Sequence, residues 1–197
     1  ASAPIYAATA EYPLAVDRQT VDLTGKPVER LAINGRIPGP VLRFTEGDEA
    51  VIHVENRLDE DTSLHWHGML LPESMDGVPG LGGFGGIPPG ESFHYRFRVR
   101  QSGTYWYHAH TRGQEQDGLY GALIIDPAEP DPIEADREHV IVLSDFHEED
   151  AAEILANLKK SSEYYQYHRR TVGDFIGNVR RDGFAGAWRS ALAPPSG

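Results

Sequence analysis

The stretch SLHWHGML (residues 63–70) places two histidines on either side of a tryptophan, and TYWYHAHT (residues 104–111) ends in a second pair of histidines. Aromatic and apolar neighbours make both stretches typical of β-strands. Side chains at positions i and i+2 of a strand point to the same face, so the two histidines of each stretch share a face. If the two strands are neighbours, four imidazole rings meet in one patch. These histidines are His65, His67, His108 and His110.

A bound metal ion is the chemistry that such a patch favours. Neutral imidazoles held close together begin to protonate near pH 6.5 and then repel one another. A cation removes this conflict, and imidazole is a ligand of zinc, copper, iron and nickel. One His-x-His pair on an exposed strand is common without a metal, but two pairs in aromatic-rich strands favour a site. The residues themselves do not identify the metal.

The composition excludes several other kinds of chemistry. The chain of 197 residues has a formal net charge of −12 and no cysteine. The acidic balance argues against nucleic acid as a partner, because no basic surface is available to meet phosphates. The lack of cysteine removes disulfides, thiolate catalysis, iron–sulfur clusters and any copper–thiolate centre from this chain. No apolar run reaches the roughly 18 residues that a membrane span needs.

The beginning of the sequence bears on localisation. The first residues, ASAPIYAATAEYP, include many small side chains. Small residues surround the cleavage site of secretory signal peptides. We therefore expect a periplasmic or otherwise exported protein.

Most of the chain has the pattern of an all-β domain. Between residues 12 and 147, short β-like runs alternate with clusters of Gly, Pro and Asp. Short strands at close spacing with turn residues between them are typical of a sandwich or barrel. In SFHYRFRV, apolar and polar residues alternate, as expected of a strand with one buried face. The predicted strands are VERLAIN, VLRFT, EAVIHVEN, SLHWHGML, SFHYRFRV, GTYWYHAH, YGALIID and EHVIVLSDF.

The pattern changes after residue 147 and becomes helical. EEDAAEILANLKK has acidic residues in its first turn and lysines in its last, which suits the helix dipole. Further along, apolar residues recur at the i, i+3, i+4, i+7 spacing of one helical face. They are Val172, Phe175, Ile176 and Val179. We therefore expect a first domain at residues 1–147 and a helical linker at 148–197, leading toward a following domain that this chain does not contain.

A family resemblance joins these motifs. The segments that carry it, in order, are NGRIPGPVLRFTEGDEAVIHVENRL, SLHWHG, MDGVPG, GIPPGESFHYRFRVRQSGTYWYHAHT and GLYGALIID. Together they resemble the first domain of multicopper oxidases, and most of all the copper-resistance oxidases of bacteria. The resemblance is dense from residue 20 to 147, and HWHG followed by WYHAH is its most specific part. It implies a Greek-key cupredoxin-like β-sandwich.

The resemblance also implies an activity and a role for each site residue. The complete enzyme would oxidise Cu(I) or small phenolic reductants, in copper resistance, and reduce dioxygen to water. His65 takes the place of the family's type 2 copper ligand, and His67, His108 and His110 take the places of type 3 copper ligands. Asp76 in MDGVPG matches an acid that helps to protonate oxygen at the cluster. Such a group is chemically needed, since reducing dioxygen to water consumes four protons.

The chain departs from the family pattern in one respect. The family's trinuclear cluster uses eight histidines, half of them from the last domain, which also holds the type 1 copper on cysteine, two histidines and often methionine. No HCH or HxxHxH motif occurs here, and there is no cysteine. The resemblance thus implies that this chain supplies half of the cluster, that a C-terminal cupredoxin domain is its partner, and that the chain alone is inactive.

Two alternatives are open at this point. A free-standing cupredoxin that sequesters copper or zinc without turnover would also lack cysteine. A cupin-type non-haem metalloenzyme would need a third histidine and a glutamate in a facial triad, which the HWHG context does not provide. The sequence beyond residue 197 would separate an oxidase from a binding module, because only the oxidase continues into an HCH motif.

Two further histidines lie on predicted strands. His53 in VIHVEN and His94 in SFHYRF each stand between apolar neighbours, which belong to the opposite face of the strand. Neither belongs to a His-x-His pair. We expect both to be solvated or hydrogen-bonded surface residues.

Overall fold

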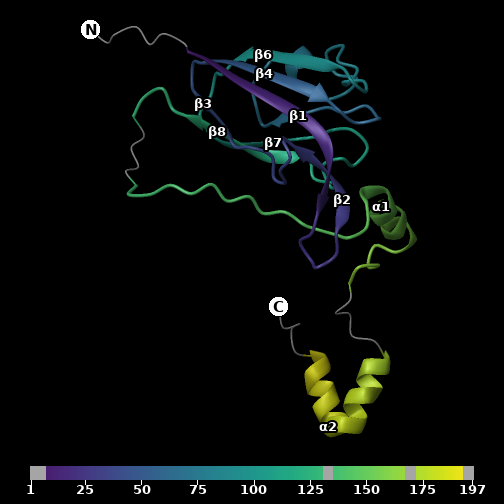
Figure 1. Cartoon of the computed structure of the whole chain (residues 1–197). Coiled ribbons are helices and arrows are strands. Elements are labelled where there is room, and N and C mark those ends of the chain that lie inside the picture. The colour runs from purple at the N-terminus through teal and green to yellow at the C-terminus, as the bar shows by residue number, and fades with distance from the viewer. Residues whose placement is uncertain (1–7, 131–134, 167–171, 193–197) are drawn as a thin grey trace. The chain divides into compact units, whose positions relative to one another are not determined.

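The first part of the molecule is a β-sandwich. The computed structural model describes residues 8–130, 135–166 and 172–192. The chain divides into two compact units, Ala1–Ala152 and Glu153–Gly197. The first unit consists of two four-stranded sheets packed face to face (Figure 1), so the predicted all-β sandwich is confirmed.

The two sheets exchange strands along the chain. Sheet A has the strand order β2-β1-β4-β6, and sheet B has the order β3-β8-β7-β5. β1 runs parallel to β4, and β3 runs parallel to β8. Parallel neighbours need a crossover rather than a hairpin, and here the crossovers pass between the sheets. The elements of this unit are β1 (Thr9–Val21), β2 (Val28–Ile33), β3 (Leu42–Thr45), β4 (Glu49–Asn56), β5 (His65–His67), η1 (Glu73–Met75), β6 (Ser92–Arg98), β7 (Gly103–His108) and β8 (Tyr120–Asp126).

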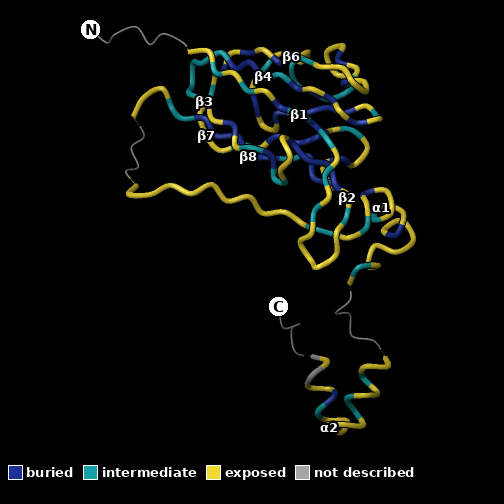
Figure 2. Tube along the Cα trace, viewed as in Figure 1, coloured by how far each residue is buried: buried dark blue, intermediate teal, exposed yellow. Residues whose placement is uncertain are grey.

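The core lies between the sheets and follows the alternation of the strands. In β6, Tyr95 and Phe97 are buried whereas His94 and Arg96 are exposed, so the alternation predicted for SFHYRFRV is confirmed. Figure 2 shows that the buried residues gather along the strands of the sandwich and that the exposed ones follow the loops. Burial of the apolar face is what stabilises these strands, since each buried large side chain contributes roughly 2 kcal/mol.

Trp66 of β5 determines which way the neighbouring histidines point. Its indole is fully buried, with its ring centroid 5.0 Å from that of Tyr95 and 5.9 Å from that of Tyr107 on β7. Successive side chains of a strand point to opposite faces. Because Trp66 points into the core, His65 and His67 must point away from it, to the outer face of sheet B.

Tyr107 fixes the strand next to β5. Its hydroxyl donates a hydrogen bond to the carbonyl oxygen of Pro40 at 2.7 Å. Its ring lies so close to β8 that a Cβ atom added at Gly121 would stand 2.4 Å from the ring atom Cζ. Only glycine leaves room for this approach. Since Tyr107 directly precedes His108, the same fit sets the position of His108.

One predicted strand is wrong. Residues 138–146, EHVIVLSDF, pair with no strand of either sheet among the described residues, and Figure 1 draws them as an extended segment. Ile141 and Leu143 are 78% and 91% exposed. The segment has high β-propensity, but a strand forms only when its backbone pairs with the edge of a sheet, and neither described sheet pairs with it. The segment is tied at its start, where Arg43 pairs with Glu138 at 3.1 Å.

The second unit is helical, as expected. Helix α1 spans Ala151–Lys160 and crosses the boundary between the units, and α2 spans Val172–Leu192 with a break at Gly183, where φ is 72°. Much of the predicted apolar face is uncovered: Val172 is 77% exposed. The domain boundary at residue 147, and the role of 148–197 as a connection to another domain, stay predictions. Among the described residues, no helix has the length and apolar content needed to cross a membrane.

Candidate metal centre

The two strands that carry the His-x-His pairs are neighbours. β5 and β7 pair antiparallel, with His65 directly opposite His108 and His67 opposite Trp106. The ring centroid of His65 lies 5.5 Å from that of His67 and 5.4 Å from that of His108. The convergence predicted from strand geometry is therefore present on the outer face of sheet B.

Three of the four histidines form a group with metal-ligand spacing. One nitrogen atom from each of His65, His67 and His108 lies within 4.8 Å of the other two. His110 follows the end of β7, and its ring centroid lies 5.6 Å from that of His65. Its backbone N–H donates to the hydroxyl of Ser63 at 3.0 Å, which ties it to the residues just before β5. The structure thus brings all four predicted histidines together, with His110 at the margin.

Asp76 lies beside His65 and controls which ring nitrogen is free. Nδ1 of His65 is 2.8 Å from the backbone carbonyl oxygen of Asp76 and 3.2 Å from its carboxylate Oδ2. Both atoms are acceptors, so Nδ1 carries the hydrogen and the lone pair is on Nε2. Hydrogen bonds of this kind fix the orientation of histidines that bind metals. Asp76 thereby prepares His65 as a ligand through Nε2.

The loop reaches His65 because Gly77 lets it come close. Gly77 has φ +80°, and a Cβ atom at this position would lie 1.8 Å from the carbonyl oxygen of Leu64. The positive φ would strain any residue other than glycine. The close approach to Leu64 leaves no room for a side chain unless one of the two backbone segments moves. The short helix η1 immediately precedes Asp76, which caps it by donating its backbone N–H to Glu73. The turn and the close approach together place Asp76.

His108 is held in a similar way by a residue that the sequence did not reveal. Its Nδ1 lies 2.9 Å from the carbonyl oxygen of Ala109 and 2.9 Å from Oε2 of Glu115. Its other nitrogen, Nε2, is 3.2 Å from Nδ1 of His67. The only signal for Glu115 in the sequence is an acid in the loop after WYHAH, which is weak because charged loop residues are common. Glu115 plays the part for His108 that Asp76 plays for His65.

The environment of His108 favours the neutral form of its imidazole. His108 is 5% exposed, and Trp106 stacks on it with ring centroids 4.1 Å apart. Burial lowers the pKa of His108, and the nearby rings of His65 and His67 lower it further, while the Ala109 carbonyl and Glu115 oppose the shift. Metals bind neutral imidazole, so a lowered pKa leaves fewer protons to displace.

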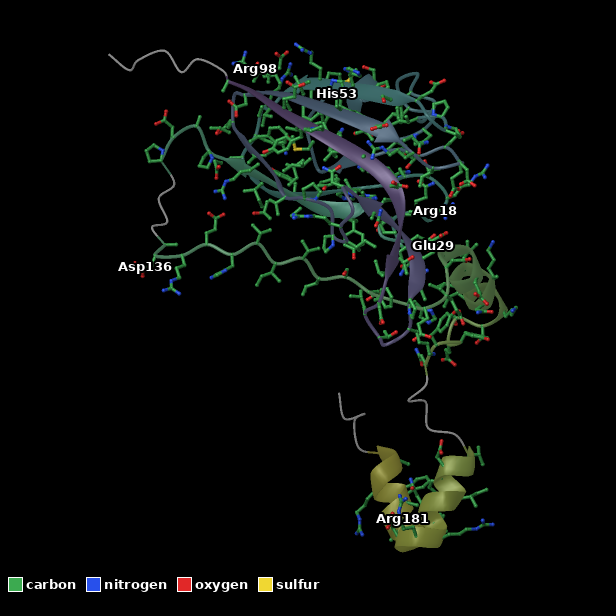
Figure 3. All side chains as sticks on the ribbon, in the orientation of Figure 1. Arg18, Glu29, His53, Arg98, Asp136 and Arg181 are labelled. Carbon is green, nitrogen blue, oxygen red and sulfur yellow. The ribbon has the colours of Figure 1, made fainter. Side chains whose placement is uncertain are left out.

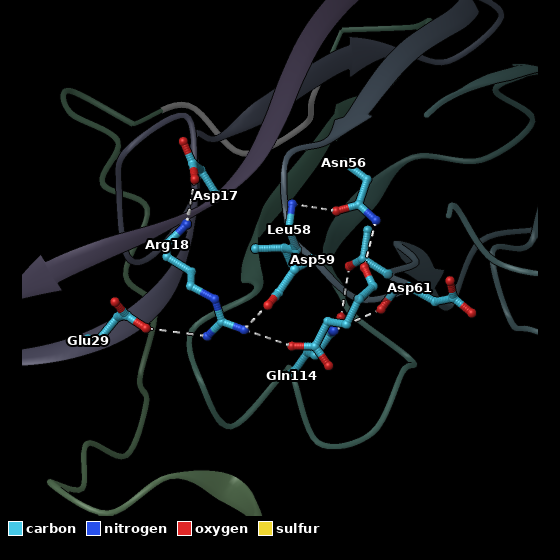
Figure 4. Close-up of polar contacts among 10 residues, drawn as sticks. Asp17, Arg18, Glu29, Asn56, Leu58, Asp59, Asp61 and Gln114 are labelled. Atoms are coloured by element: carbon cyan, nitrogen blue, oxygen red, sulfur yellow. Dashed lines mark hydrogen bonds and ion pairs between the residues drawn. The ribbon is translucent and has the colours of Figure 1, made fainter. Parts of the chain in front are cut away.

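The loops on either side of the site are tied together by Gln114. This side chain is buried; its Oε1 accepts from the hydroxyl of Thr62 at 2.8 Å, and its Nε2 donates to the carbonyl of Asp61 at 2.9 Å. Figure 4 shows Gln114 beside Asp61. Asn56 holds the residues before Asp61, since it accepts from the N–H of Leu58 and donates to the carbonyl of Glu60. The loop after β7 is therefore joined to the residues just before β5, next to the strands that carry the histidines.

The chain is similar to multicopper oxidases. Residues 15–130 match the family model described as multicopper oxidase. A copper resistance protein A homolog from Pseudomonas syringae pv. tomato is 52% identical over 175 residues, which are 89% of this chain and 30% of that protein. Copper resistance protein A of Escherichia coli is 49% identical over 89% of this chain and 29% of its own length.

Solved structures agree with these matches. The crystal structure of a multi-copper oxidase from Pseudomonas thermotolerans has a TM-score of 0.61 and 35% identity, over 64% of this chain and 32% of that chain. A laccase from Botrytis aclada has a TM-score of 0.56 and 42% identity, over 61% of this chain and 23% of its own. The chain thus spans about 30% of the length of the curated relatives it matches.

Proposed function

Because this chain belongs to the multicopper oxidase family, we propose that, as the amino-terminal cupredoxin domain, it supplies half of the histidine ligands of a trinuclear copper cluster. The observation that carries the proposal is the convergence of histidines from β5 and β7 on one sheet face, with three ligand nitrogens within 4.8 Å. His65 is the type 2 ligand, and His67, His108 and His110 are the type 3 ligands.

The donor set fits copper. All candidate ligands are imidazoles, which suit copper well, and two of them already have one ring nitrogen engaged by an acceptor, which leaves the other for the metal. Copper, when bound, supplies one-electron redox chemistry. The residues of this chain orient the ligand rings: Asp76 holds His65 and Glu115 holds His108. Trp106 and burial keep water from one side of His108.

The site also needs a partner, because it lies on an uncovered surface. His67 and His110 are exposed, and Trp106 beside them is 37% exposed. Residues 138–143 of the unpaired segment line an open groove on this face together with the buried Ala122 and Ile124 of β8. Ile141 and Leu143 of that segment are themselves exposed. We infer that a C-terminal cupredoxin domain, which carries the remaining histidines and the type 1 copper, covers this face. The share of the relatives' length outside the match supports a further domain.

The reaction proposed for the complete enzyme is oxidation of Cu(I) or a small phenolic reductant with reduction of dioxygen to water. Asp76 is the proposed proton donor, since its carboxylate is 19% exposed and lies next to His65. A carboxyl group can gain and lose a proton at this place, as general acid catalysis requires. The names of the copper-resistance relatives favour a role in copper tolerance, and we propose an exported, periplasmic location.

One alternative function is retained, a free-standing module that sequesters copper without turnover. The exposed side chains of Trp106, Ile141 and Leu143 favour the oxidase, because a solitary module gains nothing from exposing them. Both functions predict that copper binds at the cluster. They differ in oxygen uptake once the covering domain is present.

The test compares the isolated chain with the complete protein. In the isolated chain, His65→Ala and His108→Ala should each lower bound copper, measured by metal analysis, whereas His139→Ala should not. The isolated chain should show no intense blue absorption and no oxygen uptake with Cu(I) or a phenol. In the complete protein the same two variants should lose cluster copper and keep the type 1 absorption. Steady oxygen uptake by the isolated chain would contradict the proposal.

A further inference from the structure

A second pair of histidines meets on the opposite side of the sandwich. His53 of β4 and His94 of β6 are direct partners across the two strands of sheet A. Their ring centroids are 3.5 Å apart, with the ring planes inclined by 56°. Figure 3 labels His53 on this sheet. The two histidines are 41 positions apart, so the sequence, in which each stands alone, does not reveal this contact.

The core holds both histidines on the outer face of sheet A. Ile52 and Val54, the neighbours of His53, are fully buried, as is Tyr95 beside His94. Alternation along the strand then turns the two imidazoles outward. His53 is partly buried and His94 is exposed, so both are open to solvent ions. The pair is separate from the His65 cluster, because that cluster lies on the outer face of the other sheet.

Among the described residues, the nitrogen atoms of neither imidazole make a hydrogen bond or an ion pair with another residue. The aromatic contact that each ring makes there is with the other ring. Directly opposite residues of antiparallel strands have Cβ atoms about 4.5–5.5 Å apart. Two imidazoles at that spacing can each place one nitrogen about 2.0–2.1 Å from a single ion.

The charges around the pair favour a cation. His53 lines an open hollow on this face together with three acidic residues and one arginine: Glu11, Asp17, Glu55 and Arg57. Arg57 is already paired with Glu55 at 2.7 Å. On the side of His94, the guanidinium of Arg96 on the same strand is paired with Glu49 at 3.2 Å. The local balance is therefore negative.

We propose that His53 and His94 together bind one divalent transition-metal ion, Cu²⁺ or Zn²⁺, with water completing its coordination. Imidazole is a good ligand for these ions, whereas Mg²⁺ and Ca²⁺ prefer oxygen. Two protein ligands on an open face bind more weakly than the His65 cluster and exchange the ion more readily. The site gives the domain a second, accessible place for the type of metal that the family uses.

The experiment isolates this site by removing the cluster. In the 197-residue chain carrying His65→Ala and His108→Ala, titration calorimetry with Zn²⁺ should show one remaining equivalent, and Mg²⁺ should show none. Adding His53→Ala or His94→Ala should weaken Zn²⁺ binding at least tenfold. Adding His139→Ala should leave it unchanged. With Cu²⁺, electron paramagnetic resonance should show coupling to two nitrogens that is lost in both pair variants.

The outcomes are distinguishable. If the cluster-deleted chain binds no Zn²⁺, or binds it equally well after His94→Ala, the second site does not exist. His94→Gln, which keeps a polar side chain on the exposed face, separates loss of a ligand from loss of the fold, and circular dichroism checks the latter. Because the measurement is made without the His65 cluster, its failure leaves the proposed oxidase function untouched.

Discussion

The two outer faces of the sandwich both carry clustered histidines, but they prepare them differently. On sheet B, His65 is held by Asp76 and His108 by Glu115, at distances of 3.2 and 2.9 Å. On sheet A, the rings of His53 and His94 contact each other, and within the described residues no carboxylate or carbonyl oxygen orients either of them. Imidazole rings that are already oriented by hydrogen bonds lose less conformational entropy when they bind a metal. The residues that support the rings, rather than the histidines themselves, are therefore what distinguishes the two faces.

Gly77→Ala should have the largest effect, because it displaces the loop that carries Asp76 and so removes the support of His65. The added Cβ would stand 1.8 Å from the Leu64 carbonyl oxygen, at φ +80°. We expect a loss of about 4 kcal/mol in the free energy of unfolding, measured with urea. Gly80→Ala is the matched control in the same loop, since its φ is +93° but nothing lies within 4 Å of the added atom. It should cost only about 1 kcal/mol, and equal losses would refute the close approach.

Asp76→Asn should separate support from proton transfer. The backbone carbonyl of residue 76 still accepts from His65 Nδ1, so the complete enzyme should keep its fold and copper content. Asparagine cannot donate a proton and regain it, so reoxidation by dioxygen should slow by roughly a hundredfold or more. Stopped-flow reoxidation of the reduced variant measures this. A wild-type rate would leave Asp76 as a turn residue that orients His65.

Substitution of Glu115 tests whether this carboxylate orients His108 as a metal ligand. Glu115→Ala should weaken copper binding about 10- to 100-fold, the usual cost of losing a residue that orients a metal ligand. Glu115→Gln should cost less, because its amide oxygen still accepts from Nδ1 of His108. Glu29→Ala on β2, whose side chain is exposed and pairs with Arg18, serves as the acidic control. Competition titration with a copper chelator gives the affinities, and an unchanged affinity in Glu115→Ala would remove it from the site.

The smallest effect expected is a dependence of stability on pH. Burial lowers the pKa of His108 in the folded state, so below its ordinary value of about 6.5 the unfolded chain binds more protons there. The contribution of neutral His108 to the free energy of unfolding is therefore complete above about pH 6.5. It is lost as the pH falls from there through the lower pKa of the folded state. Urea unfolding of the metal-free chain between pH 7.5 and 5 should show this decline. His108→Gln should show a shallower one.

The segment 138–146 and β4 show where prediction from sequence succeeds and fails. EAVIHVEN was predicted as a strand and forms β4, Glu49–Asn56, because its buried residues meet the core of this domain. EHVIVLSDF has equal β-propensity, yet Ile141 and Leu143 are exposed and the segment is unpaired. Propensity is a local property, whereas a strand exists only if a neighbouring edge bonds to it. We expect this segment to become a strand when a further domain supplies that edge.

By itself, the sequence determined the properties that depend on local spacing. The His-x-His pattern placed each pair on one face of its strand, and Trp66 between His65 and His67 on the opposite face. The absence of cysteine excluded a copper–thiolate centre in this chain. These inferences need only the twofold periodicity of a strand and the chemistry of the side chains, so no contact between distant residues had to be known.

Only the tertiary structure decided which distant residues meet. Glu115 reaches His108 through the fold of the loop after β7, and His53 lies opposite His94 through the register of β4 and β6. Strand register depends on core packing, as in the fit of Tyr107 on β7 against Gly121 on β8, and a shift of one residue would turn every side chain to the other face. The histidines could therefore be named from the sequence, but the residues that support them, and the second pair, required the folded chain.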